Sequence, residues 1–381
     1  MSSAARIAIF LVVVLSVWSL FHAYFVFRLF SLPLVTAHAS RAVRWGVLLV
    51  LFLSYPVGRV LSRDLPGPFS SSVEMVGAVW MGFLFLGTVA FLSADLLTGF
   101  GKLWPSAAVP ARTAALVVAL ALSAVAVVQG LRPPRVVPHE VVLPGLPEER
   151  DGLRVVQLTD LHLGSLLGPR WLSRRLDQVA SLAPDLLVVT GDLVDSENGS
   201  VEPLVPLLSR LSAPLGVWGV SGNHEFYAGL EKSLALYRRA GIRVLSDEWK
   251  EVVPGLVLAG VDDLTARRQF GRREDPLPKA LAGAPATAAK VLLSHSPMKV
   301  EEAASLGVGL MLSGHTHGGQ IWPFSYLSAI PYPRNVGRFE VGTMTLLVSR
   351  GTGTWGPPMR LFRRSEILVV TLRAGGAASR T

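Results

Sequence analysis

The N-terminal part of this 381-residue chain contains four stretches that carry no lysine or arginine. A helix needs about 20 largely apolar residues, within a range of roughly 17–25, to cross the hydrocarbon core of a bilayer. The first, third and fourth stretches reach that length, whereas the second is shorter and contains Pro56. The stretches are Ile7–Phe27, Gly46–Gly58, Val76–Ala94 and Thr113–Leu131. We therefore predict an α-helical transmembrane region of about four helices over residues 1–131.

Composition and charge agree with a membrane region at the front of the chain. Hydrophobic residues make up 50% and charged residues 17%, which is too apolar for an ordinary soluble enzyme. A cleaved signal peptide would be followed by soluble sequence, but here further apolar runs follow the first one. With four helices, one side carries Arg28, Arg41, Arg44, Lys102 and Arg112, and the other Arg6, Arg59, Arg63, Arg132 and Arg135. We expect a multi-pass integral membrane protein, and the positive-inside rule favours neither orientation.

The pattern changes after the prolines that follow the last apolar stretch. Residues 132–150 are interpreted as a linker and first edge segment. Beyond it a strand-like run at Leu153–Leu158 precedes a helix-like segment at Arg170–Leu182, and Leu186–Thr190 precedes Pro203–Leu211. Strands that alternate with helical segments predict a layered α/β domain, which we place at residues 151–373. Residues 374–381 are expected to form a disordered tail.

Five of the eight histidines belong to short segments that each follow an apolar, strand-like run. Histidine and carboxylate side chains placed repeatedly at strand ends can converge on one rim of a sheet. They can hold metal ions there. In chain order the segments are Thr159-Asp160-Leu161-His162, Gly191-Asp192, Gly222-Asn223-His224-Glu225, Ser294-His295 and Gly314-His315-Thr316-His317.

The spacing within these segments suits metal binding. Asp160 and His162 are two residues apart, so in an extended chain both side chains leave the same face and can hold one ion. His315 and His317 repeat that spacing. Imidazole and carboxylate together favour Mn, Fe, Co, Ni or Zn, whereas an all-oxygen site would favour Mg or Ca. Asp192 could bridge two ions, and Asn223 offers a neutral oxygen ligand.

Each segment taken alone has an ordinary structural explanation. A single histidine after a strand, such as His295, is more often a hydrogen-bonded structural residue. A Gly-Asp pair is common at turns that follow a strand. Gly222-Asn223 could form a tight turn, because both residue types tolerate positive φ. The ordered set, with one element after each of five strands, favours a shared metal site over these separate explanations.

The order D-x-H, GD, GNH[DE], single H and GHTH resembles that of the calcineurin-like metallophosphoesterase superfamily. Ser349–Gly353 and Pro357–Phe362 are similar to its membrane-associated branch, which includes bacterial phosphodiesterases and transmembrane metallophosphoesterase proteins. The resemblance covers residues 153–372 and implies a four-layer α/β/β/α sandwich. It also implies two divalent metal ions, such as Mn, Fe or Zn, as cofactors.

Carried over residue by residue, the resemblance implies a ligand set for each metal. One metal would be held by Asp160, His162, Asp192 and His317, and the second by Asp192, Asn223, His295 and His315. Asp192 would bridge the two ions. His224 matches the motif histidine that binds no metal and acts beside the leaving group. All of these positions are occupied by the expected residue types.

The chemistry of such a centre predicts a hydrolase. Two divalent ions lower the pKa of a bridging water, so that hydroxide is present near neutral pH and can attack phosphorus in line. Both metals would stabilise charge on the phosphoryl oxygens. His224, as imidazolium, would protonate the departing oxygen. The predicted reaction is cleavage of a phosphoester, phosphodiester or pyrophosphate bond.

Three function classes follow from these features. The favoured one is a membrane-anchored phosphohydrolase, for which membrane attachment makes a lipid-linked or amphiphilic substrate plausible. The second is a membrane-attached nuclease of similar chemistry, against which the lack of an obvious basic, aromatic-rich surface counts. The third is a sensor or transport-linked membrane protein in which the soluble domain mainly binds a phosphate ligand. Against it counts that the apolar helices contain almost no ionisable groups to form a pathway.

Overall fold

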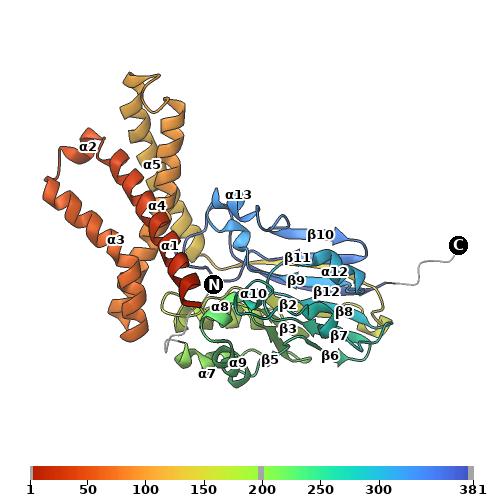
Figure 1. The fold of residues 1–381 in the computed structure, drawn as a ribbon. Coiled ribbons are helices and arrows are strands. Elements are labelled where there is room, and N and C mark those ends of the chain that lie inside the picture. Colours follow the sequence, from red (N-terminus) through yellow and green to blue (C-terminus); the bar gives the residue numbers. More distant parts are fainter. Residues whose placement is uncertain (1–2, 196–200, 376–381) are drawn as a thin grey trace.

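The computed structural model describes residues 3–195 and 201–375, in which a helical bundle lies beside a two-sheet domain (Figure 1). The bundle consists of α1 (Ser3–Leu29), α2 (Pro33–Thr36), α3 (Arg41–Asp64), α4 (Pro68–Leu97) and α5 (Pro105–Leu131). All but the short α2 are long and apolar enough to cross a membrane, which confirms the prediction of four such helices. The second apolar stretch belongs to a continuous helix, because α3 runs through Pro56.

Two kinds of contact hold the bundle together. At Gly77 of α4 the backbone of α3 comes so close that an added Cβ would lie 2.3 Å from the nitrogen of Tyr55. Asp95 of α4 is fully buried and forms ion pairs with Arg28 of α1 and Arg112 of α5, at 2.5 and 3.0 Å. The single carboxylate therefore joins three helices.

The second domain contains two six-stranded sheets. In the first sheet, of order β1-β12-β2-β3-β4-β5, only the β12–β2 pair is antiparallel. In the second, of order β10-β11-β9-β8-β7-β6, the two outer pairs are antiparallel. The strands are β1 (Arg135–Leu143), β2 (Arg154–Leu158), β3 (Leu186–Thr190), β4 (Val217–Val220), β5 (Arg243–Val244), β6 (Glu248–Val253), β7 (Leu256–Gly260), β8 (Ala289–Leu293), β9 (Leu310–Ser313), β10 (Gly337–Val341), β11 (Met344–Val348) and β12 (Glu366–Ala374).

Helices cover the outer faces of both sheets, which confirms the predicted four-layer arrangement. The helices of this domain are α6 (Pro169–Ala180), α7 (Val205–Leu208), α8 (Asn223–Tyr227), α9 (Leu230–Arg239), α10 (Ala266–Gln269), α11 (Pro276–Ala280), α12 (Val300–Ser305) and α13 (Phe324–Ser328). Apolar residues of α6, α7 and α9 pack on the first sheet, and those of α11 and α12 pack on the second. A third apolar cluster fills the space between the sheets, where Val155, Leu186, Leu258 and Leu310 are fully buried. Burial of this kind contributes about 25 cal/mol per Å² of apolar surface.

The two ends of the domain differ in part from the sequence-based boundaries. Within residues 132–150, β1 pairs with β12 over its whole length and forms the edge of the first sheet. Ala374, which we assigned to a disordered tail, is the last residue of β12 and pairs with Leu143. Residues 376–381 of that tail lie outside the described part of the chain.

The bundle contacts the domain through a segment that precedes β12. The backbone nitrogen of Arg360 donates to the carbonyl of Ala126 in α5 at 2.8 Å, and that of Phe362 donates to Oε1 of Gln129 at 3.1 Å. Leu86 and Ala126 of the bundle share an apolar cluster with Met359 of this segment. The helices therefore lie directly against loops at one edge of the two-sheet domain (Figure 1).

Candidate metal centre

All eight predicted site residues lie where strands of the two sheets end. Parallel strands bring their carboxyl ends to the same edge, so residues far apart in the chain meet there. Asp160 and His162 follow β2, Asp192 follows β3, Asn223 and His224 begin α8 after β4, His295 follows β8, and His315 and His317 follow β9. The geometry therefore brings the five sequence segments together.

Five of these residues have left-handed backbone conformations. The φ angles are 52° at Asp160, 46° at His162, 50° at Asp192, 71° at His315 and 50° at His317. Residues other than glycine rarely adopt positive φ, and each such residue costs roughly 1–3 kcal/mol. Backbone strain of this kind persists where the surrounding fold holds it, and it is concentrated at functional sites.

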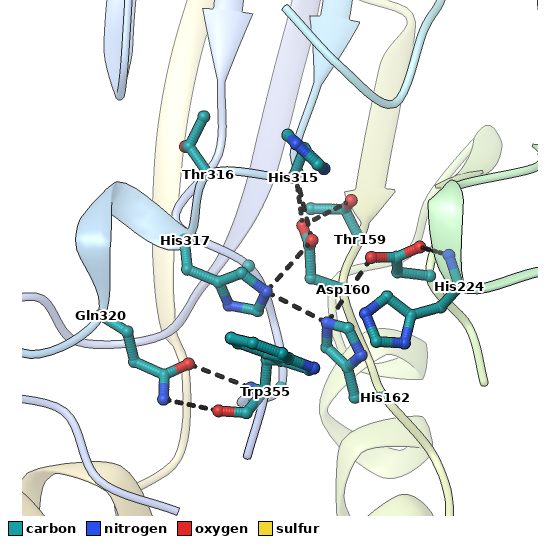
Figure 2. A network of polar contacts seen from close by, with 12 residues as sticks. Thr159, Asp160, His162, His224, His315, Thr316, His317, Gln320 and Trp355 are labelled. Atoms are coloured by element: carbon teal, nitrogen blue, oxygen red, sulfur yellow. Dashed lines mark hydrogen bonds and ion pairs between the residues drawn. The ribbon is translucent and has the colours of Figure 1, made fainter. Parts of the chain in front are cut away.

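One group of potential ligands surrounds His317. Its Nε2 lies 3.1 Å from Nε2 of His162 and 3.3 Å from Oδ1 of Asp160 (Figure 2). Nε2 of His162 is in turn 3.7 Å from Oδ2 of Asp192. The side chains of Asp160, His162 and His317 can hold one metal ion, because their ligand atoms all lie within 4.8 Å of one another.

A second group surrounds His295. Its Nε2 lies 3.1 Å from Oδ2 of Asp192, 3.2 Å from Oδ1 of Asn223 and 3.3 Å from Nδ1 of His315. Nδ1 of His315 also lies 2.8 Å from Oδ1 of Asn223. Asp192, His295 and His315 form a second set of residues that can hold a metal ion. Asp192 contacts ligand atoms of both groups.

The hydrogen bonding of His295 tests whether a cation fits here. Its Nδ1 lies 2.8 Å from the carbonyl of Thr190, which can only accept, so Nδ1 carries the proton. In the neutral ring, Nε2 then carries a lone pair, and this lone pair faces a carboxylate, an amide oxygen and another imidazole nitrogen. Several acceptors directed at one point are satisfied by a divalent cation, and this mixture of nitrogen and oxygen suits Mn, Fe or Zn.

The charges of the buried groups agree with a site for positive charge. Burial alone would raise the pKa of Asp192, but His295, His224 and His162 outweigh it and hold the pKa of this carboxyl well below its usual range. Burial favours neutral His295, but Asp192 raises its pKa well above the usual value. Burial, together with the neighbouring His162, lowers the pKa of His317, so that ring is a neutral potential ligand.

His224 is held beside the two groups. Its backbone nitrogen donates to Oδ1 of Asp192 at 2.9 Å. Its ring Nδ1 lies 2.9 Å from the carbonyl of Asp195, so Nδ1 carries a proton and Nε2 is the free ring atom. The ring centroid is 4.6 Å from that of His162 and 6.1 Å from that of Trp355. His224 is thus oriented by the chain itself, with one nitrogen available to a bound substrate.

Glu225 organises two of the site loops. Its fully buried carboxylate accepts hydrogen bonds from the backbone nitrogens of Asp192, Leu193 and Gly222 at 2.9, 2.9 and 2.7 Å. Gly222 cannot be larger, because an added Cβ would lie 2.2 Å from Oδ1 of Asp192. Glu225 therefore ties the loop after β3 to the start of α8.

Three contacts were not anticipated from the sequence. Oδ1 of Asp195 lies 3.5 Å from Nδ1 of His162 and 3.5 Å from Nδ1 of His224. The available sequence signal for Asp195 was that it is a second carboxylate, three residues after Asp192. The hydroxyl of Tyr332 lies 2.8 Å from Nε2 of His315, with no local pattern to reveal it. Gln320 holds the backbone of Trp355 through its Nε2 and Oε1 (Figure 2).

Comparison with known proteins agrees with this geometry. A family model described as "Calcineurin-like phosphoesterase" matches residues 153–319. An uncharacterized metallophosphoesterase of Aquifex aeolicus is 36% identical over 230 residues, which cover 59% of this chain and 86% of the relative. The chain belongs to the calcineurin-like phosphoesterase family.

Two further relatives are named as transmembrane proteins that carry this domain. A "Transmembrane protein with metallophosphoesterase domain" of Danio rerio is 37% identical over 273 residues, 68% of this chain, and the chain spans 62% of that relative's length. Together with the four candidate spans, this makes the phosphoesterase an integral membrane protein. A solved structure titled as a dimetal phosphatase from Danio rerio aligns with 58% of this chain and 99% of its own, at 13% identity and a TM-score of 0.37.

Proposed function

We propose that this phosphoesterase is a membrane-anchored hydrolase with a dinuclear metal centre that cleaves a phosphoester, phosphodiester or pyrophosphate bond. The observation that carries the proposal is the pair of ligand groups that share Asp192. Asp160, His162, Asp192 and His317 would hold one ion, and Asp192, Asn223, His295 and His315 the other. The short distances between their nitrogen and oxygen atoms support this assignment.

The protein's own residues have distinct tasks in this mechanism. Two divalent ions, when bound, would supply a hydroxide nucleophile near neutral pH and neutralise phosphoryl charge. His224 donates a hydrogen bond from Nδ1 to the carbonyl of Asp195, which fixes the ring. As imidazolium, it would protonate the departing oxygen through Nε2. Glu225 keeps Asp192 in place through the backbone, so that the shared carboxylate does not move during the reaction.

The test uses the full-length protein in detergent, loaded with Mn²⁺ and assayed with bis-p-nitrophenyl phosphate. We expect metal-dependent release of p-nitrophenol that is lost in His315→Ala. His139→Gln is a matched control, because this histidine lies on β1 at the far edge of the first sheet and should retain activity. Undiminished turnover in His315→Ala, or turnover that survives removal of the metal, would contradict the proposal.

The surface between the bundle and the site favours an amphiphilic, lipid-linked substrate. Trp322, Tyr326, Leu327 and Ile330 are exposed around α13. Phe324 of the same helix packs edge-on against Phe85 of the membrane helix α4, at 6.0 Å between ring centroids. Exposed aromatic and aliphatic side chains next to a candidate membrane helix would suit contact with the acyl chain of a substrate.

Trp355 continues the apolar surface to the metal centre. Its side chain is 52% exposed, and its ring lies next to that of His224. A substrate with an acyl chain in the bilayer could therefore present its phosphate to His224 without leaving the membrane surface. A soluble nucleic acid has no acyl chain to bind this apolar surface, so the surface does not favour it as a substrate.

A paired substrate assay tests the lipid-linked substrate. The long-chain probe is dodecyl p-nitrophenyl phosphate in mixed micelles, and the soluble probe is bis-p-nitrophenyl phosphate. Leu327→Ser should raise KM for the long-chain probe and leave the soluble reaction unchanged. Val142→Ser, at an exposed apolar position on β1, should change neither. Equal effects of Leu327→Ser on both probes would rule out recognition of the chain by this surface.

A further inference from the structure

One charged contact joins the membrane bundle to the surroundings of the metal centre. Arg59 lies near the C-terminal end of α3, which is the second of the four long apolar helices. Its Nη1 forms ion pairs with Glu74 of α4, at 3.2 Å, and with Asp195 of the catalytic domain. Asp195 is three residues beyond Asp192. The side chain of Arg59 therefore turns toward the phosphoesterase domain.

The position of Arg59 is fixed by close packing of α3 on α4. Glu74 is 1% exposed, so its carboxylate depends on partners within the protein. Oε1 contacts Arg59, and Oε2 accepts a 2.5 Å hydrogen bond from the hydroxyl of Ser165 in the loop after β2. At Gly58 an added Cβ would lie 2.5 Å from Cα of Glu74, so the two helices are in backbone contact here.

Asp195 links its ion pair with Arg59 to two histidines of the site. Oδ2 of Asp195 pairs with Arg59, while Oδ1 lies 3.5 Å from Nδ1 of His162 and from Nδ1 of His224. The nitrogens involved are those that face away from the site, since Nε2 of His162 meets His317. A carboxylate behind a metal-binding imidazole fixes the ring orientation, and loss of such a partner typically reduces metal affinity or activity roughly 10–100-fold.

We propose that Arg59 is a positioning residue of the metal centre, through which the packing of α3 against α4 governs the orientation of His162 and His224. This inference rests on the proposed function for its catalytic consequence. Arg59 holds Oδ2 of Asp195, which leaves Oδ1 facing Nδ1 of His162. The backbone carbonyl of the same residue accepts the hydrogen bond from Nδ1 of His224. A shift of α3 relative to α4 moves Arg59 relative to Glu74 and pulls on Asp195, and this changes the alignment of both rings.

A purely structural ion pair is the competing explanation, and the two make different predictions. A structural pair would affect only the attachment of the bundle, and hence thermal stability. A positioning residue affects kcat and metal affinity, and does so only while Asp195 is present. Double-mutant cycles separate these cases, because residues in one network show non-additive effects.

The experiment compares Arg59→Gln, Arg59→Lys, Asp195→Asn and the Arg59→Gln/Asp195→Asn double variant in the full-length protein. We expect Arg59→Gln to lower kcat for bis-p-nitrophenyl phosphate and to weaken Mn²⁺ binding, each roughly 10-fold, with little change in KM. Arg59→Lys should restore much of both. In the Asp195→Asn background, Arg59→Gln should add no further loss.

Arg63→Gln is the matched control, because Arg63 lies one turn further along α3 and pairs only weakly with the exposed Asp64, at 3.6 Å. Equal kcat and Mn²⁺ affinity in Arg59→Gln and Arg63→Gln would overturn the proposal. A full further loss in the Asp195→Asn background would overturn it too. If the wild type binds Mn²⁺ but cleaves no phosphoester, the proposed function fails. Mn²⁺ affinity then still decides the role of Arg59.

Discussion

The membrane bundle and the catalytic edge both bury charged side chains, but they compensate them differently. In the bundle, the carboxylate of Asp95 meets two guanidinium groups, those of Arg28 and Arg112. At the edge, the carboxylate of Asp192 shares a small volume with imidazole nitrogens and an amide oxygen, nearly all of which are acceptors when the rings are neutral. The first cluster is complete within the chain, whereas the second calls for an added cation.

The comparison predicts that loss of one carboxylate has different consequences in the two regions. At the edge it should remove a function and alter stability only when metal is present. In the bundle it should leave Arg28 and Arg112 without their counter-charge and reduce stability under all conditions. Four substitutions test this difference.

Asp192→Asn should have the largest effect. This carboxylate contacts both ligand groups, so its loss should reduce phosphoesterase activity more than the roughly 100-fold expected for an indirect partner of a metal. Mn²⁺ should raise the Tm of the wild type through preferential binding to the folded state, and this increase should disappear in the variant. A variant that keeps the Mn²⁺-dependent rise in Tm would show that Asp192 is not shared by two ions.

His224→Asn should reduce kcat next most strongly, by roughly 10²–10⁴-fold, because it removes a proton donor to the leaving oxygen. The loss should be smaller with p-nitrophenol as leaving group than with an alkoxide, since p-nitrophenolate needs little protonation. The Mn²⁺ content should stay near that of the wild type. An equal loss for both leaving groups would argue that His224 holds the substrate and does not act as an acid.

Asp95→Asn tests the bundle. Removal of this buried carboxylate leaves Arg28 and Arg112 without their counter-charge, which typically destabilises by about 3–5 kcal/mol. Thermal unfolding in detergent should show the loss with and without Mn²⁺, while the activity per folded molecule is retained. Asp64→Asn is the control, because its pair with Arg63 is exposed and such pairs contribute roughly 0–1 kcal/mol. A metal-dependent change in Asp95→Asn would contradict the separation of the two regions.

The sequence predicted those parts of the fold that local patterns determine. The fully buried strand β3 matches the apolar run at Leu186–Thr190 residue for residue, because strands buried on both faces are continuously apolar. The edge strands β6 and β10 were not predicted. Both alternate exposed charged residues with partly buried ones, as is usual for strands at a sheet edge.

The same distinction holds for the site. Each potential ligand was recognisable because it stands in a short motif directly after a strand. Tyr332 and Arg59 carry no local signal, and the contact of Arg59 with Asp195 joins residues 136 positions apart. Only the three-dimensional packing of the chain reveals such pairs. Sequence patterns therefore indicated the ligands of the centre better than the residues that orient those ligands.

Gly58→Ala should have the smallest effect and joins the two regions of the comparison. The added methyl group would meet the backbone of Glu74, and insertion into a tight contact of this kind typically costs about 1–3 kcal/mol. The better helix propensity of alanine, about 0.5–1 kcal/mol, offsets part of it. Because Arg59 and Glu74 must shift, we also expect a few-fold lower kcat.

Gly46→Ala is the matched control, because nothing lies within 4 Å of an added Cβ at this position of the same helix. It should keep kcat and change Tm little or upward. If Gly58→Ala lowers kcat but leaves the Mn²⁺ affinity unchanged, the helix spacing affects the alignment of His224 and not metal binding by His162. Identical kcat in the two glycine variants would mean that the spacing of α3 and α4 does not influence the metal centre, and that the two regions act independently.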